Sequence, residues 1–177
     1  MVKVPPKQEK TLGGLVLPDA AQQRPTSGDV VSLGKDCETA REGETVLYSK
    51  FGIGVTDLHW GEDVYAVLRE LDVIGVLPAS GATAEDIKDI KPNVGRVLLE
   101  VDDADEESLG GVFLTDSARE KPLSATVVTV GAPAEGKEAK VKAGDRVLFF
   151  KYAGDTVPTK DGTVYNVILE NDILARI

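Results

Sequence analysis

Short apolar runs separated by turn residues dominate the chain. The runs are rich in β-branched and aromatic side chains, which is typical of β-strands rather than helices. They occupy residues 28–34, 44–51, 64–71, 96–101, 125–131, 145–152 and 163–169. Strands of this length at short intervals favour small barrels or sandwiches. The pattern therefore predicts an all-β chain.

Residues 81–90, which read GATAEDIKDI, are the one stretch whose composition favours a helix. Most of its side chains are polar, so we expect neither core to need it. We interpret residues 80–89 as a linker that contains one helical turn. Residues 160–163 instead hold an Asp-Gly pair, which predicts a tight turn between two strands.

The same order of residues occurs twice in the chain. When residues 11–34 are placed on residues 108–131, eleven of the 24 pairs are identical. Later segments match at slightly different offsets: residues 42–51 with 143–152, and 64–77 with 164–177. Small changes of offset confined to loops are typical of duplicated domains. We therefore expect a first module at residues 1–79 and a second at 90–177, with the linker at 80–89 between them.

Composition narrows the possible functions. The chain has 177 residues, 42% of them hydrophobic, and a formal net charge of −10, so nucleic acid is not expected as a partner. No stretch reaches the ~20 apolar residues that a membrane span needs, and the first residues contain no signal-peptide core. The single cysteine, Cys37, excludes an internal disulfide. It either indicates a reducing compartment or is uninformative.

Catalytic and metal-binding residues are scarce. With one histidine, His59, and one cysteine, the usual His/Cys zinc sets are excluded, and no Ser/His/Asp arrangement is supported. Lys160, at a predicted hairpin turn, resembles the modified lysine of lipoyl and biotinyl carrier domains. The corresponding turn of the first repeat, residues 59–63, has no lysine. We therefore predict no enzyme activity, no catalytic residue, no metal and no cofactor.

A Leu-Gly-Gly sequence followed by three apolar residues occurs once in each repeat, between polar segments. Glycine pairs are unfavourable in strand interiors, but the apolar residues alone are also compatible with an ordinary strand core. The recurrence of the glycines favours an exposed binding loop. The candidate site residues are Leu12, Gly13, Gly14, Leu15, Val16, Leu17, Leu109, Gly110, Gly111, Val112, Phe113 and Leu114.

The ordered set of motifs resembles the chaperonin-10 (GroES-type) co-chaperonin family. The second repeat supplies KPNVGRVLLEV, SLGGVFL, ATVVTVG, AGDRVLFFKYAG and ENDILARI, and the first supplies TLGGLVL, GDVVSLG, EGETVLYSKFG and LDVIGVL. The head-to-tail arrangement resembles the tandem-module 20-kDa co-chaperonins of chloroplasts. The resemblance covers almost the whole chain apart from the linker.

The resemblance implies a fold and a function. Each repeat would be a small irregular GroES-like β-barrel with a long mobile loop and a short roof hairpin. The two loops would dock on a chaperonin-60 ring in the chloroplast stroma and assist ATP-dependent protein folding. ATP would be bound and hydrolysed by the partner, and other single- or double-module co-chaperonins would complete a mixed ring. The alternative is a tandem β-barrel adaptor that binds a different groove through the same loops.

Three departures from the family pattern affect these expectations. The first strand of the first module is reduced to Val2–Lys3–Val4, so the junction to a neighbouring chain should be weak. Within the chain, we expect residues 96–99 to pair with residues 74–77. Gly95 stands where the family usually has aspartate, and both roof segments, residues 35–42 and 132–143, are short.

Overall fold

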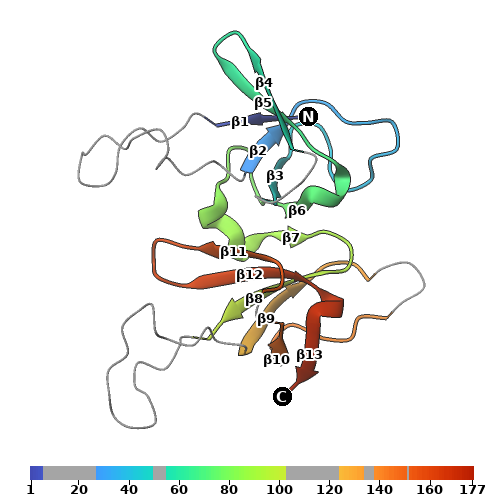
Figure 1. The fold of residues 1–177 in the computed structure, drawn as a ribbon, viewed down its shortest axis with the longest axis vertical. Helices are drawn as coiled ribbons and strands as arrows, with labels where there is room; N and C mark the ends of the chain where they lie inside the picture. The colour runs from blue at the N-terminus through green and yellow to red at the C-terminus, as the bar shows by residue number, and fades with distance from the viewer. Residues whose placement is uncertain (6–26, 50–54, 103–123, 134–137, 151) are drawn as a thin grey trace. The chain divides into compact units, whose positions relative to one another are not determined.

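A computed structural model describes residues 1–5, 27–49, 55–102, 124–133, 138–150 and 152–177 of the chain. The chain divides into two compact units, Met1–Asn93 (unit 1) and Val94–Ile177 (unit 2). Each unit is built on one antiparallel sheet (Figure 1). The prediction of an all-β chain built of two tandem modules is confirmed by this architecture.

Unit 1 contains a seven-stranded sheet in the order β4-β5-β1-β2-β3-β6-β7. Its strands are β1 (Val2–Val4), β2 (Ser27–Val30), β3 (Thr45–Tyr48), β4 (Thr56–Trp60), β5 (Asp63–Val67), β6 (Val73–Val76) and β7 (Lys91–Pro92). Two 3₁₀-helices accompany them, η2 (Glu70–Asp72) and η3 (Ala84–Asp89). Gly61, at the tip of the β4–β5 hairpin, adopts a positive φ of 64°, which a tight turn requires.

Unit 2 contains a six-stranded sheet in the order β11-β12-β8-β9-β10-β13. Its strands are β8 (Arg96–Val101), β9 (Ser124–Val130), β10 (Arg146–Phe149), β11 (Asp155–Pro158), β12 (Val164–Leu169) and β13 (Ile173–Arg176). The 3₁₀-helix η4 (Glu170–Asp172) precedes the last strand, as η2 precedes β6 in unit 1.

Strand register shows that the two units repeat one fold. Lys3 lies opposite Asp29 in unit 1, and Glu100 lies opposite Thr126 at the same place in unit 2. An irregularity falls between Leu47 and Tyr48 where β3 meets β6. Its counterpart falls between Leu148 and Phe149, where β10 meets β13. The duplication predicted from the sequence is therefore present in the backbone.

Each unit has its own apolar core, formed by side chains that point to one face of its sheet. The buried cluster of unit 1 comprises Val2, Val30, Ala40, Val46, Tyr48, Ala66 and Val73. That of unit 2 comprises Val97, Leu99, Ala125, Val127, Val141, Val147, Phe149 and Ile168. The small strand β1 belongs to the core through Val2, which is 3% exposed, although β1 spans only three residues where β8 spans six.

Two expectations about the connection between the modules are wrong. Residues 96–99 do not pair with residues 74–77, because β8 is already paired on both sides, with β9 and β12. The partner of β6 is instead β7, through Gly75 opposite Pro92 and Val76 opposite Lys91. Gly75 permits this close approach, since a Cβ there would lie 2.5 Å from the Lys91 carbonyl oxygen.

The predicted linker was also expected to be unneeded by either core, and this is wrong. Ile87 and Ile90 are fully buried, at 0% and 2% exposure. The helix η3 that places them begins at a capping box: the Thr83 hydroxyl accepts from the Glu85 N–H at 3.3 Å, and Asp86 Oδ2 accepts from the Thr83 N–H at 2.8 Å. Two isoleucines among polar residues give too weak a period to reveal burial from sequence.

Gly95, the departure from the family pattern noted above, precedes β8 in unit 2. Its φ is +70°, a conformation that glycine adopts without strain. Its N–H donates to the Ala132 carbonyl at 2.8 Å, and its own carbonyl accepts from Glu170 N–H at 2.9 Å. The glycine therefore closes a backbone connection between the start of β8, the end of β9 and η4.

Candidate functional site: the bases of the two loops

The predicted binding residues lie at 12–17 and 109–114, within segments 6–26 and 103–123, and are outside the described residues. What the structure gives is the frame from which each segment starts and to which it returns. In unit 1 that frame is the end of β1 and the start of β2. In unit 2 it is the end of β8 and the start of β9. The two frames have different chemistry.

Asp102 and Ser124, the residues that border segment 103–123, contact each other twice. The Asp102 N–H donates to the Ser124 carbonyl at 3.2 Å, and the Ser124 hydroxyl donates to Asp102 Oδ2 at 2.6 Å. The ladder between β8 and β9 continues up to this point, with Val101 opposite Ala125. The two ends of the segment are therefore held side by side.

Arg146 on β10 adds a third contact to this frame. Its guanidinium donates from Nη2 to Asp102 Oδ2 at 2.5 Å, the same oxygen that accepts from Ser124. The Ser124 hydroxyl is the main cause that holds the pKa of Asp102 below its usual value; burial opposes it, and Arg146 lowers the pKa further. The carboxylate therefore stays ionised and paired at neutral pH.

The frame of unit 1 lacks this arrangement. The positions that correspond to Asp102, Ser124 and Arg146 are Pro5, Ser27 and Thr45. Proline supplies no carboxylate and no N–H, so the paired contacts at Asp102 have no counterpart.

Side chains of the unit 1 frame serve other contacts. The Thr45 hydroxyl donates to Asp29 Oδ1 and accepts from the Gly81 N–H at 2.9 Å. The Gly81 N–H also lies 3.1 Å from Asp29 Oδ1. Lys3 on β1 forms an exposed ion pair with Asp63 at 2.8 Å. Thr45 and Asp29 thus hold the segment that leads to η3, rather than the ends of a loop.

Two glutamates, one in each unit, accept hydrogen bonds from the roof segments, and the sequence analysis did not predict them. Glu70 Oε1 accepts the N–H groups of Glu38 and Thr39, both at 2.8 Å, together with the Thr39 hydroxyl. At the corresponding place in unit 2, buried Glu170 accepts the Lys140 N–H at 2.6 Å. The Thr39 hydroxyl, followed by the amide of Glu38, lowers the pKa of Glu70. The repeat itself was the available signal, because both glutamates stand two residues before an aspartate in matched positions.

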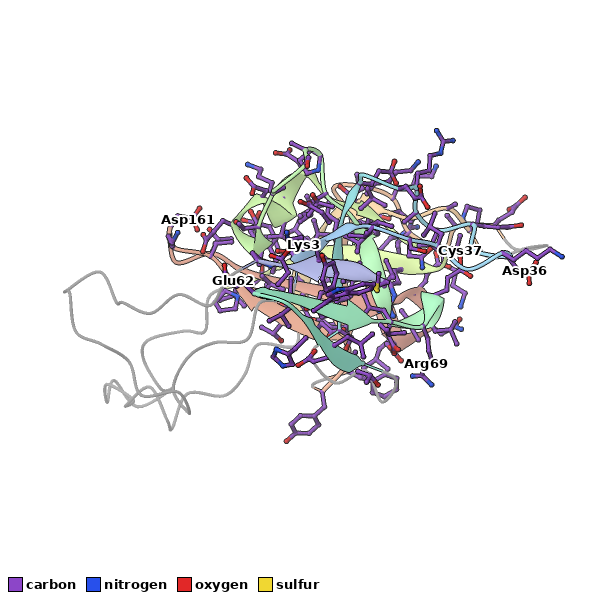
Figure 2. The ribbon with its side chains drawn as sticks, turned by 90° about the horizontal axis from the view of Figure 1, so that it is seen from above. Lys3, Asp36, Cys37, Glu62, Arg69 and Asp161 are labelled. Atoms are coloured by element: carbon purple, nitrogen blue, oxygen red, sulfur yellow. The ribbon has the colours of Figure 1, made fainter. Side chains whose placement is uncertain are left out.

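The other residues considered from sequence lie apart from the loop frames. Glu62 lies in the turn between β4 and β5. Figure 2 shows Cys37 and its neighbour Asp36 on the opposite side of unit 1 from Glu62. His59 is exposed on β4.

Lys160 lies in the turn between β11 and β12. Thr159 and Asp161 hold this turn, through the Thr159 hydroxyl and a bond from the Thr163 N–H to Asp161 at 3.0 Å. Among the described residues, no group of three or more His, Cys, Asp or Glu side chains could hold a metal ion. No helix in the described part of the chain has the length and apolar character to cross a membrane.

Comparison with known proteins decides the family. A sequence model of the chaperonin 10 kDa subunit family matches residues 1–77 and again residues 89–177. The chain belongs to the chaperonin 10 kDa subunit family. Each match covers one of the two repeats, so the sequence resemblance and the tandem organisation of family modules are both confirmed.

Relatives of two sizes place the chain within the chaperonin 10 family. It is 36% identical over 188 residues to the Arabidopsis thaliana 20 kDa chaperonin, chloroplastic, covering 99% of this chain and 72% of that protein. The spinach protein of the same name (Spinacia oleracea) is 32% identical over a similar span. The co-chaperonin GroES of Parabacteroides distasonis is 43% identical over 88 residues, 50% of this chain and 98% of the bacterial protein.

Proposed function

We propose that this protein is a tandem co-chaperonin that caps a chaperonin-60 ring through the two loops at residues 6–26 and 103–123. The observation that carries the proposal is the family match in both repeats, together with the common strand register. Relatives named chloroplastic 20 kDa chaperonin and co-chaperonin GroES support it. No observation favours the adaptor alternative.

Binding through the loops follows from their composition. Leu15-Val16-Leu17 and Val112-Phe113-Leu114 would bury apolar surface in a groove of the chaperonin, at roughly 1.5–3 kcal/mol per fully buried side chain. Ordering a loop costs ~1–2 kcal/mol per residue in backbone entropy, so one loop binds weakly. Several loops on one lid bind tightly by avidity and still release when the chaperonin changes state.

The proposal is tested by binding to a chaperonin-60 ring in the presence of ATP or ADP. We expect the wild-type chain to bind, and a variant with both apolar triplets replaced by serine to lose binding. Val31→Ser, at an exposed apolar position outside the loops (44% exposed), should bind as the wild type does. Absence of wild-type binding, or binding that survives in the double-loop variant, would contradict the proposal.

ATP hydrolysis is assigned to the partner, and the chain itself is proposed to be neither an enzyme nor a cofactor-binding protein. The purified chain should show no ATPase activity and should not change the substrate of the chaperonin chemically. A stromal location is proposed because the two plant relatives are named chloroplastic. Fractionation of isolated chloroplasts with an antibody to the chain would test it, and recovery in the membrane fraction would contradict it.

A mixed ring with other co-chaperonin modules is supported by unequal burial in the two repeats. Leu174 on β13 is 54% exposed, whereas its counterpart Ile74 on β6 is 1% exposed. In the strand next to the opposite edge of the sheet, Val67 of β5 is 40% exposed and its counterpart Val167 of β12 is fully buried. Unit 2 thus presents an apolar last strand, and unit 1 presents an apolar hairpin face.

These two exposed faces occupy positions that are buried in the other repeat, so we assign each to contact with a neighbouring co-chaperonin module. β13 has one strand neighbour, β10, within the described residues, and its free edge can accept another strand. Whole two-module chains supply even numbers of modules to a sevenfold chaperonin ring. Native mass spectrometry should therefore detect a seven-module ring only when a single-module co-chaperonin is added. A seven-module ring from this chain alone would contradict the assignment.

A further inference from the structure

The frame of the second loop contains a cluster of three polar side chains that the family match does not assign. Asp102 is the last described residue before segment 103–123, and Ser124 is the first after it. Arg146 reaches the same Asp102 oxygen from β10, two strands away from β8. We call Asp102, Ser124 and Arg146 the exit clamp. It is the point at which segment 103–123 leaves the sheet.

The exit clamp is poorly suited to stabilise the core. The side chains of Asp102 and Arg146 are 29% and 57% exposed, and ion pairs at such exposure contribute little to folding. The ladder between β8 and β9 is closed one residue earlier, by Val101 and Ala125. The contacts beyond that pair therefore act mainly on the geometry with which the segment leaves the sheet.

Arg146 is itself held in place from its other side. Its carbonyl accepts the Ile177 N–H at 2.9 Å, and its neighbour Val147 lies opposite Arg176 on β13. The guanidinium therefore projects from a backbone that is paired with β9 and β13 together. A charged donor on a fixed backbone can restrict a carboxylate more than one on a free loop, because less freedom is lost when the contact forms.

The first repeat provides an internal comparison. Its counterparts to the exit clamp are Pro5, Ser27 and Thr45, and the Thr45 hydroxyl is bonded to Asp29 and Gly81 instead. The ladder of unit 1 also ends earlier: its last pair, Lys3 opposite Asp29, corresponds to Glu100 opposite Thr126. Within the described residues, Pro5 and Ser27 are thus not joined to each other as Asp102 and Ser124 are.

We propose that the exit clamp is a positioning device that restricts the directions of segment 103–123 and makes the second loop the stronger chaperonin contact. The inference rests on the proposed function. A loop with constrained ends loses less conformational entropy when it docks. The same apolar residues therefore bind more tightly from unit 2 than from an unclamped frame.

The test measures the affinity of the full chain for a chaperonin-60 ring with ADP. Asp102→Ala and Ser124→Ala should each weaken binding about fivefold, or ~1 kcal/mol at 25 °C. The variant that carries both Asp102→Ala and Ser124→Ala should bind little more weakly than either single variant, because the two residues act as one unit. Arg146→Ala should weaken binding, and Arg146→Lys should restore part of it. Glu100→Gln removes a carboxylate two residues earlier on the same face of β8 and should leave binding unchanged.

Combination with loop variants separates positioning from general stability. The effect of Asp102→Ala should persist when Leu15-Val16-Leu17 is replaced by serine, and disappear when Val112-Phe113-Leu114 is replaced. Urea midpoints of the clamp variants should stay close to that of the wild type. Failure of the wild type to bind would overturn the proposed function. If the wild type binds and the clamp variants bind equally well, only the proposed role of the exit clamp is overturned. The same holds if the variants lose binding only in proportion to their loss of folded protein.

Discussion

The last strands of the two units have the same place in the fold and opposite surroundings. In unit 1, β6 lies between β3 and β7, and its Ile74 is buried. In unit 2, β13 is paired with β10, and Leu174 and Ala175 are exposed. The matched position in the middle of each strand differs accordingly. Gly75 of β6 leaves room for the Lys91 carbonyl oxygen, whereas β13 has Ala175 there, with a side chain. Equal apolar patterns can thus serve an internal contact in one repeat and an external one in the other.

The loop frames differ in the same way. Unit 2 uses a carboxylate, a hydroxyl and a guanidinium to join the ends of its loop, whereas unit 1 uses Asp29 and Thr45 to hold Gly81. Matched positions in the two repeats therefore make different contacts. One frame joins Asp102 to Ser124 and Arg146, and the other secures the connection that precedes η3.

The largest effect should come from removing the apolar triplet of either loop, and it should differ between the two loops. Replacement of Val112-Phe113-Leu114 by serine should reduce chaperonin affinity by more than about hundredfold, since each buried apolar side chain contributes roughly 1.5–3 kcal/mol. Replacement of Leu15-Val16-Leu17 should reduce it less, because that loop lacks the aromatic ring and the exit clamp. Titration calorimetry with chaperonin-60 and ADP measures both. Equal losses, or a larger loss from the first triplet, would contradict the ranking.

A smaller effect is expected from exchanging the residues at the edges of β6 and β13. Gly75→Ala should destabilise unit 1 by about 1–3 kcal/mol, because the new Cβ would lie 2.5 Å from the Lys91 carbonyl oxygen. Ala175→Gly, at the exposed counterpart, should change the urea midpoint by much less. Urea denaturation followed by far-UV circular dichroism measures both changes. A neutral Gly75→Ala variant would show that β7 does not approach β6 closely.

The smallest effect should be the pH dependence that Glu70 gives to unit 1. Its pKa is lowered in the folded protein from an ordinary value of 4.5, mainly by the Thr39 hydroxyl. A lowered folded pKa means that its contribution is fully present above pH 4.5 and is lost as the pH falls through the folded value. Glu70→Gln should cost about 1 kcal/mol at neutral pH and flatten the loss of stability in acid. Unfolding curves at pH 7 and below pH 4.5 measure this, and an unchanged acid slope would contradict it.

Sequence patterns predicted most of the strands because short runs of β-branched and aromatic residues between turn residues are a local signal. They failed at β7 and η3. Lys91–Pro92 pairs with the edge of β6, and Ile87 and Ile90 are buried, and neither contact can be read from the local pattern. They also missed the roof glutamates and the exit clamp. Glu70 and Thr39 are 31 residues apart, and Arg146 and Asp102 are 44 apart, so only folding brings them together.

The duplication, the all-β class and the family could be predicted without coordinates, because repeated motifs in fixed order are recognised from residues alone. Only the fold shows which edge β7 covers, which residues border each predicted loop, and which apolar side chains remain exposed. These properties depend on hydrogen bonds and burial between segments distant in the chain. Two repeats with matched sequence therefore acquire different contacts once each is surrounded by its own neighbours.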